Sequence, residues 1–255
     1  MQLSLQAVSH AYGSLEVLSG IDLQVNEGEI VCVVGPSGCG KSTLLRLAGG
    51  LERPTRGAVM LEGEAAPGVL NPLTYVFQDF ALLPWRTVGE NVELVLDHHG
   101  LSRSAKADIV NDVLSRTHLS EFKAAWPRQL SGGMRQRVGI ARALAVRPEI
   151  WLMDEPLSAL DSQTRELLMD DLVDLWTHTP FSALYVTHNL AEATRLGHRI
   201  VLLTGRPGCV HSVTEVGIPL GDRAAHIAEL EAIRQDIWGQ MRDQAAQADR
   251  EMRHG

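Results

Sequence analysis

Four short, almost wholly apolar runs constrain the fold of this chain more than any other feature. They cover residues 29–34, 150–153, 183–187 and 200–204. A strand with one wet face alternates apolar and polar residues, whereas a strand covered on both faces is continuously apolar. Together with β-branched runs at residues 3–8 and 73–77, these segments predict an α/β core built on a mainly parallel sheet.

Helical periodicity fills the intervals between these runs. The helical segments are residues 41–47, 105–117, 132–145 and 163–176. Strand patterns stop between about residues 79 and 145, which predicts an α-helical subdomain inserted into a domain of residues 1–221. In the tail, residues 222–255, apolar side chains recur at helical spacing, so we expect a helix that docks on the core rather than a free tail. These apolar residues are Ile227, Leu230, Ile233, Ile237 and Met241.

The composition argues against several classes of protein. With 255 residues, 45% of them hydrophobic, the chain can bury a core without metals or disulfides. Its three widely spaced cysteines fit neither a disulfide framework nor a zinc site and favour a reducing cytosol. The sequence shows no signal-peptide pattern and no apolar run near the ~18 residues of a membrane span. A net charge of -8 with dispersed basic residues argues against nucleic acid as a partner.

Residues 35–42, GPSGCGKS, fit the phosphate-loop pattern GxxxxGK[ST] between an apolar strand and a helix. Here the glycines let backbone N–H groups surround a phosphate, and the helix N-terminus adds a favourable dipole. Lys41 would reach the β- and γ-phosphate oxygens, and Ser42 would bind Mg²⁺. The flanking strand and helix disfavour an ordinary Gly-rich turn. The residues predicted to contact the nucleotide are Gly35, Pro36, Ser37, Gly38, Cys39, Gly40, Lys41, Ser42 and Thr43.

The apolar run at residues 150–153 ends in two adjacent carboxylates, Asp154 and Glu155. Such a pair at the end of a strand is most often a solvated corner. Because a phosphate loop is also present, we assign Asp154 to Mg²⁺ and Glu155 to polarising the attacking water. Successive strand residues point to opposite sides, which would direct one carboxylate to the metal and the other to the water.

Residues 130–134, LSGGM, resemble the LSGGQ signature of the ATP-binding cassette (ABC) ATPases. Ser131 is a good helix N-cap, and Gly132 and Gly133 let backbone N–H groups approach an anion. Alone, this pattern fits a simple capped helix, but an acidic strand follows it closely. Met134 replaces the usual final Gln, which matters little if the backbone of residues 131–133 supplies most of the phosphate contacts.

The resemblance to the ABC ATPases covers nearly all of residues 1–215, with the motifs in the family's order. Tyr12 is similar to the aromatic residue that stacks on adenine, although any surface Tyr fits that position. Gln78 resembles the Q-loop glutamine that senses Mg²⁺ and water, and Asp161 the D-loop residue that crosses a dimer interface. His188 resembles the H-loop histidine that touches the γ-phosphate. The plainer alternatives are a solvated turn Gln, a helix cap and a polar strand end.

This resemblance implies a RecA-like P-loop NTPase core with an N-terminal antiparallel β subdomain and an inserted α-helical subdomain. It also implies ATP and Mg²⁺ as cofactors, with Lys41, Gln78, Glu155 and His188 acting in hydrolysis. The family works as a head-to-tail pair with two sandwiched nucleotides. Because this chain carries one set of motifs, it must pair, most simply with a second copy of itself.

Residues 77–88, FQDFALLPWRTV, and the segment 206–208, RPG, are similar to the ATPase subunits of nitrate, taurine and aliphatic-sulfonate importers. This similarity implies integral membrane permease subunits, an external solute-binding protein and a peripheral position on the cytoplasmic side of the cell membrane. The residues expected to dock the permease are Phe80, Leu82, Leu83 and Trp85. The alternative is that these side chains pack the helical subdomain.

Three rival functions follow from other members of the family. A soluble cytosolic ABC ATPase that acts as an assembly scaffold is the alternative from another class. Cassettes that act on DNA or ribosomes typically carry coiled-coil insertions or tandem cassettes, which this sequence lacks. A non-enzymatic cassette is disfavoured by the presence of Glu155 and His188.

Overall fold

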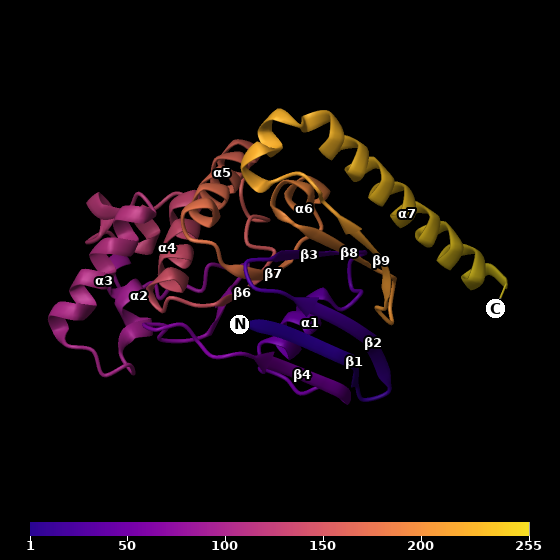
Figure 1. Cartoon of the computed structure of the whole chain (residues 1–255), viewed down its shortest axis with the longest axis horizontal. Coiled ribbons are helices and arrows are strands. Elements are labelled where there is room, and N and C mark those ends of the chain that lie inside the picture. Colours follow the sequence, from indigo (N-terminus) through magenta and orange to yellow (C-terminus); the bar gives the residue numbers. More distant parts are fainter. Residues whose placement is uncertain (255) are drawn as a thin grey trace. The chain divides into compact units, whose positions relative to one another are not determined.

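The computed structural model describes residues 1–254, with side chains described to residue 244. The chain divides into two compact units, one formed by Met1–Glu64 with Met169–Gly255 and the other by Ala65–Leu168. Figure 1 shows the helices and strands of both units along the chain. Across residues 1–254, no helix combines the length and the apolarity that a bilayer span requires.

The first unit contains an antiparallel sheet at the N-terminus. Its strands are β1 (Gln2–Tyr12), β2 (Leu15–Val25) and β4 (Arg56–Glu62), in the order β2-β1-β4. Both partners of β1 run antiparallel to it. The predicted N-terminal antiparallel β subdomain is therefore confirmed.

The parallel strands of this unit are β3 (Ile30–Val34), β7 (Ser182–Val186) and β8 (Arg199–Leu203), with β3 between the other two. Strand β9 (Val210–Glu215) adds to β8 in the antiparallel direction. Every residue of β3 and β7 is buried, which confirms the expectation drawn from their continuous apolar sequence. Helix α1 (Lys41–Ala48) follows β3 and contacts β7, and α6 (Leu190–Leu196) follows β7 and contacts β3.

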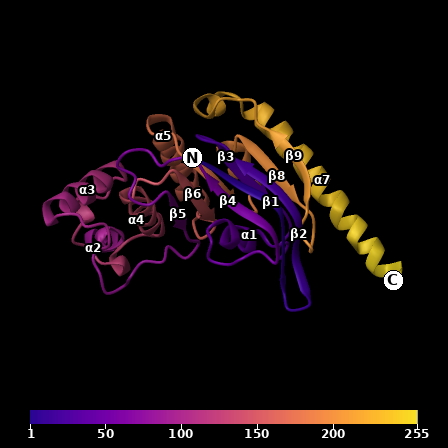
Figure 2. The ribbon, with the colours of Figure 1, turned by 60° about the horizontal axis from the view of Figure 1, so that its bottom comes forward.

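The C-terminal segment consists of a 3₁₀ turn, η4 (Leu220–Ala225), and a long helix, α7 (Ile227–His254). Helix α7 contacts α6 and η4, and both Figure 1 and Figure 2 show it beside β9. Leu230 and Ile237 are buried, and Ser212 of β9 donates a hydrogen bond to Gln240 over 2.6 Å. The predicted docking of the tail as a helix is confirmed for these residues.

The second unit is mostly helical. It holds two parallel strands, β5 (Leu73–Val76) and β6 (Ile150–Asp154), and helix α5 (Ser162–His178) begins in it. Between the two strands, the regular secondary structure of the described chain consists of helices and 3₁₀ turns. These are α2 (Val88–Glu93), η1 (Leu94–Leu96), α3 (Arg103–Arg116), η2 (Ser120–Phe122), η3 (Pro127–Gln129) and α4 (Gly132–Ala145). Helix α4 contacts α2, α3 and β5. The domain boundaries at residues 79, 145 and 221 stay predictions.

Candidate active site

The phosphate loop, residues 35–42, lies in the first unit between the end of β3 and the start of α1. The Lys41 side chain folds back over this loop, and its Nζ donates to the carbonyl oxygens of Gly35 at 2.9 Å and Pro36 at 3.1 Å. Lys41 is only 6% exposed, whereas Ser42 beside it is exposed. The loop therefore holds a buried cation above its own backbone.

Close packing determines the properties of two residues of the loop, Gly40 and Cys39. Gly40 precedes α1 with a φ of 102°, a left-handed backbone that a side chain would strain. A Cβ there would also lie 2.8 Å from Leu18 Cδ2. Cys39 is buried, and this burial raises the pKa of its thiol despite the nearby Lys41 charge. The thiol is therefore a neutral packing group rather than a thiolate.

A second loop supports the phosphate loop from the segment 206–208. Gly208 N–H donates to Val17 O at 2.8 Å, and Gly208 O accepts from Ser19 N–H at 3.1 Å. A Cβ at Gly208 would lie only 2.2 Å from the Cys39 carbonyl oxygen. The sequence singled out this segment only through its likeness to a subgroup of importers; the support it gives to the phosphate loop appears first in the structure.

Tyr12 ends β1 in the same unit and is 44% exposed. Its hydroxyl donates to Glu52 at 2.5 Å and accepts from Arg46 of α1 at 3.3 Å. The His10 ring meets its edge with centroids 4.7 Å apart. Tyr12 is thus linked to the helix that follows the phosphate loop, and its stacking on adenine stays a prediction.

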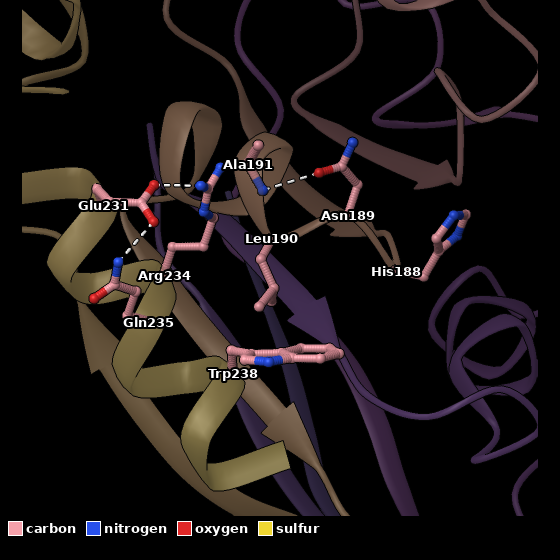
Figure 3. Close-up of a pocket in the computed structure, with 8 residues that line it drawn as sticks. All are labelled: His188, Asn189, Leu190, Ala191, Glu231, Arg234, Gln235 and Trp238. Carbon is pink, nitrogen blue, oxygen red and sulfur yellow. Dashed lines mark hydrogen bonds and ion pairs between the residues drawn. The ribbon is translucent and has the colours of Figure 1, made fainter. Parts of the chain in front are cut away.

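His188 follows β7 and precedes α6, and its side chain is exposed. It lies at one end of a cleft of about 490 Å³ whose other wall is α7. Figure 3 shows Leu190 above the indole of Trp238, with Glu231, Arg234 and Gln235 nearer the start of α7. The chain therefore places the candidate γ-phosphate contact beside an open space rather than in packed protein.

Arg223 of η4 holds the far end of the helix that starts after His188. Its guanidinium is buried and donates to Thr194 O of α6 at 3.2 Å and to Ile218 O at 3.0 Å. Burial lowers the pKa of Arg223 to about 10, so the group stays charged at neutral pH. The sequence offered no signal for this residue, because it lies in a polar segment without a motif.

In the second unit, Asp154 is the last residue of β6, and its carboxylate accepts from the Tyr75 hydroxyl at 3.3 Å. Glu155 follows the strand in a left-handed conformation, with a φ of 43°. Its carbonyl oxygen accepts from Ser158 N–H at 3.1 Å and from the Ser158 hydroxyl at 2.9 Å. The two carboxylates are therefore separated by a turn of the backbone, and the expected alternation along a strand does not describe Glu155.

The signature segment starts α4 in the same unit. Ser131 is the N-cap residue, and its Oγ accepts from Met134 N–H at 3.2 Å. Position 134 thus serves the cap through its backbone. A Cβ on Gly133 would lie 2.5 Å from Thr164 Cγ2, and one on Gly132 3.4 Å from Leu160 Cδ2. The two glycines therefore let the start of α4 pack closely against residues 160–164.

Asp161 lies in that neighbouring segment and caps α5. Its carboxylate accepts from Thr164 N–H at 3.0 Å and from the Thr164 hydroxyl at 2.7 Å. The hydrogen bond from the Thr164 backbone is the main cause of its lowered pKa. The helix-cap interpretation is therefore realised, and a role across a dimer interface stays a prediction.

Gln78 lies past the end of β5 and is exposed. The loop after it is fixed by two side chains that lie outside the predicted site residues. Arg142 of α4 donates to Ala81 O at 2.6 Å and to Phe80 O at 3.1 Å. The Asn91 amide of α2 accepts from Leu83 N–H at 2.8 Å and donates to three carbonyl oxygens of residues 83–87.

The predicted site residues thus gather in two groups. The phosphate loop, Tyr12 and His188 belong to the first unit, and Gln78, Asp154, Glu155, residues 131–133 and Asp161 belong to the second.

Comparisons with known proteins identify the family. The ABC transporter family model matches residues 18–158. The chain is 42% identical over 238 residues to the aliphatic sulfonates import ATP-binding protein of Xanthomonas axonopodis pv. citri, covering 92% of this chain and 94% of that protein. It is 43% identical over 207 residues to the nitrate import ATP-binding protein of Synechocystis, covering 81% and 78%.

Among solved structures, the chain is similar to a dimeric post-hydrolysis state of the ATP-binding cassette MJ0796 bound to ADP and Pi. The TM-score is 0.72 at 34% identity, covering 85% of this chain and all of that one. This likeness agrees with the mixed α/β fold and its mainly parallel strands. Its motifs, its fold and its relatives together show that this chain belongs to the ABC transporter family, as one of its ATPase subunits.

Proposed function

We propose that this chain binds ATP and hydrolyses it to power an importer of a small anion, of the nitrate, sulfonate or taurine type. Relatives with about 40% identity carry import names for nitrate and aliphatic sulfonates, and these names supply the substrate class. The observation that carries the ATPase part is the phosphate loop with the Lys41 ammonium folded over its carbonyl oxygens.

Nucleotide binding follows from the first unit. A triphosphate offers strong anionic acceptors to Lys41 Nζ, which exchanges its bonds to Gly35 and Pro36 for phosphate oxygens. The N–H groups of residues 37–43 and the N-terminus of α1 add positive potential. Tyr12 stacks on the adenine ring with its exposed face. Together these contacts hold the γ-phosphate in place for attack.

The residues assigned to Mg²⁺ fit that ion by their chemistry. Ser42, Gln78 and Asp154 offer a hydroxyl, an amide carbonyl and a carboxylate, all of them the oxygen ligands that Mg²⁺ prefers. Within the described residues no group of three or more His, Cys, Asp or Glu side chains forms a metal cage, which suits an ion that takes most of its ligands from phosphates and water. When bound, Mg²⁺ neutralises charge on the β- and γ-phosphate oxygens.

Hydrolysis requires a water aligned with the γ-phosphorus and stabilisation of the charge that develops there. Glu155 polarises this water, and Gln78 helps to orient it. His188 and Lys41 donate to the γ-phosphate oxygens as ADP leaves. The turn that Ser158 closes on the Glu155 carbonyl fixes the backbone from which this carboxylate acts.

The enclosure is completed by a second copy of the chain. Ser131, Gly132 and Gly133 of one copy cap the ATP held by the phosphate loop of the other, and Asp161 lies at the junction. The dimeric cassette bound to ADP and Pi, 34% identical to this chain, supports this arrangement. ATP closes the pair and hydrolysis releases it, so the cycle switches an interface.

Transport requires partners outside the cassette. We propose that permease subunits dock at Phe80, Leu82, Leu83 and Trp85, and that an external solute-binding protein delivers the anion. The chain then works on the cytoplasmic side of the cell membrane, where ATP is available. The relatives' import names give no support to the alternative of a soluble assembly scaffold.

Glu155→Gln tests the hydrolytic assignment. The amide keeps the shape of the side chain but cannot polarise water as a carboxylate does, so turnover should fall about 100-fold or more. ATP binding should remain, and size-exclusion chromatography with ATP should show a trapped dimer. Glu166→Gln, at an exposed position of α5, is the matched control. Near-normal ATPase activity of Glu155→Gln would remove Glu155 from the mechanism.

A further inference from the structure

Glu192 is a buried carboxylate four residues after His188. It lies on α6, which starts where the His188 loop ends, and it is only 2% exposed. A buried carboxylate is costly unless hydrogen bonds satisfy it. Its hydrogen-bond partners therefore indicate its role.

Three side chains around His188 donate to this carboxylate. Its Oε2 accepts from the Tyr185 hydroxyl at 2.9 Å and from the Thr187 hydroxyl at 2.8 Å. Its Oε1 accepts from the Asn189 amide at 3.2 Å. Both immediate neighbours of His188 are thus tied to one carboxylate.

The hydrogen bonds continue into the backbone of the loop. The Thr187 hydroxyl accepts from Asn189 N–H at 3.0 Å, and Thr187 N–H donates to Val33 O of β3 at 3.2 Å. The peptide group that precedes Thr187 is therefore bound to the buried strand that leads into the phosphate loop, and the peptide group that follows His188 is bound to the Thr187 side chain.

On the side that faces α7, side-chain packing does not hold the loop of residues 187–189 in place. The cleft of about 490 Å³ opens beside His188 there, and Trp238 on its far wall is 54% exposed (Figure 3). A loop that borders open space keeps one conformation only if hydrogen bonds hold it from within.

We propose that Glu192 is a positioning residue, which holds the loop of residues 187–189 so that His188 meets the γ-phosphate during hydrolysis. This inference rests on the proposed role of His188. A carboxylate suits the task because both of its oxygens accept hydrogen bonds, whereas a Gln amide would set its NH₂ group against one of the three donors.

The test compares ATP hydrolysis by the full-length protein and its Glu192→Gln variant. Losing one of three buried hydrogen bonds should lower kcat about tenfold, while the KM for ATP changes less than about twofold because the phosphate loop is intact. The matched control is Glu215→Gln at an exposed position of β9, which should retain wild-type kcat. Thermal unfolding of each variant checks that it is folded.

A double variant separates positioning from general damage. In the His188→Ala background, measured by single-turnover hydrolysis, Glu192→Gln should cause no further loss, because its effect passes through His188. An equal loss in both backgrounds, or an unchanged kcat in the single variant, would overturn the proposal. If His188→Ala itself kept wild-type kcat, the proposed role of His188 would be wrong. This outcome is distinct from a failure of the Glu192 proposal alone, in which His188→Ala lowers kcat but Glu192→Gln does not.

A second pair of variants keeps the test independent of whether Glu192→Gln folds. Thr187→Val removes the hydroxyl that links Glu192 to Asn189 N–H, and it should lower kcat in the same way. Thr187→Ser keeps the hydroxyl and should restore most of the activity. If Val and Ser variants were equally active, or equally impaired, the hydrogen-bonded chain would not be what positions the loop.

Discussion

At the scale of single residues, Gly208 is a position where adding one methyl group should weaken nucleotide binding. Its missing Cβ leaves room for the Cys39 carbonyl oxygen, which would otherwise lie 2.2 Å away. Gly208→Ala must push the phosphate loop, so we expect about 1–3 kcal/mol of lost stability and about tenfold weaker ATP binding. Isothermal titration with ATP and thermal unfolding measure both effects.

Gly205→Ala is the control for this prediction, because a Cβ there meets nothing within 4 Å. The control should change stability by less than about 0.5 kcal/mol and leave ATP affinity intact. Equal ATP affinities for the two variants would show that the phosphate loop does not depend on this contact.

The residue scale is also where the sequence was least informative about geometry. The residue types and the order of the motifs singled out Asp154 and Glu155, but the prediction treated both as successive residues of one strand. The left-handed turn at Glu155, φ 43°, depends on two hydrogen bonds from Ser158 that no propensity scale encodes. Glu192 was missed for a related reason, since its partners come together only when β7 and α6 fold against each other.

At the scale of secondary-structure elements, continuous burial made strands easy to predict. Strands β3 and β7 are buried along their whole length, and their continuous apolar sequences therefore indicated buried strands. Strand β4 is exposed at six of its seven residues, and β9 alternates between intermediate and exposed positions. Most apolar residues of β4, among them Met60 and Leu61, are exposed, and β9 mixes apolar and polar residues. Sheet hydrogen bonds rather than burial hold such strands, and the sequence therefore did not predict them.

Helix α7 offers a prediction at this scale. Ile237 is 1% exposed on its docked face, whereas Ile227 at its start is 71% exposed. Ile237→Ala should cost about 2–4 kcal/mol because it leaves a cavity, and Ile227→Ala should cost less than about 0.5 kcal/mol. Chemical denaturation of both variants compares them directly. Equal losses would mean that α7 does not dock through this face.

At the scale of the whole molecule, the order of the motifs along the sequence predicts site residues that lie in two compact units. The family resemblance adds a prediction that local chemistry could not make, namely that a second copy completes each site. The proposed transport substrate cannot be predicted from this chain, because an ATPase subunit would not contact it. The proposed docking surface for a membrane partner can be compared with the structure, because its side chains differ in exposure.

The loop after Gln78 combines a rigid backbone with an exposed aromatic side chain. Arg142 and Asn91 fix its backbone N–H and carbonyl groups, and Trp85 is 68% exposed. This exposure disfavours the alternative that Trp85 packs the helical subdomain. Trp is enriched among the hot spots of protein interfaces, so an exposed Trp on this loop fits a docking surface.

Trp85→Ala should therefore act only when the permease is present. Because the side chain is mostly solvated, unfolding free energy should change by less than about 0.5 kcal/mol, and ATP turnover of the isolated subunit by less than about twofold. In proteoliposomes with the permease and its binding protein, anion-stimulated ATPase and uptake should both be lost. Trp126→Ala, at a 38% exposed Trp of the same unit, should keep both. If Trp85→Ala lowered the turnover of the isolated subunit to the same extent, the side chain would support the fold of the loop rather than the contact with the membrane partner.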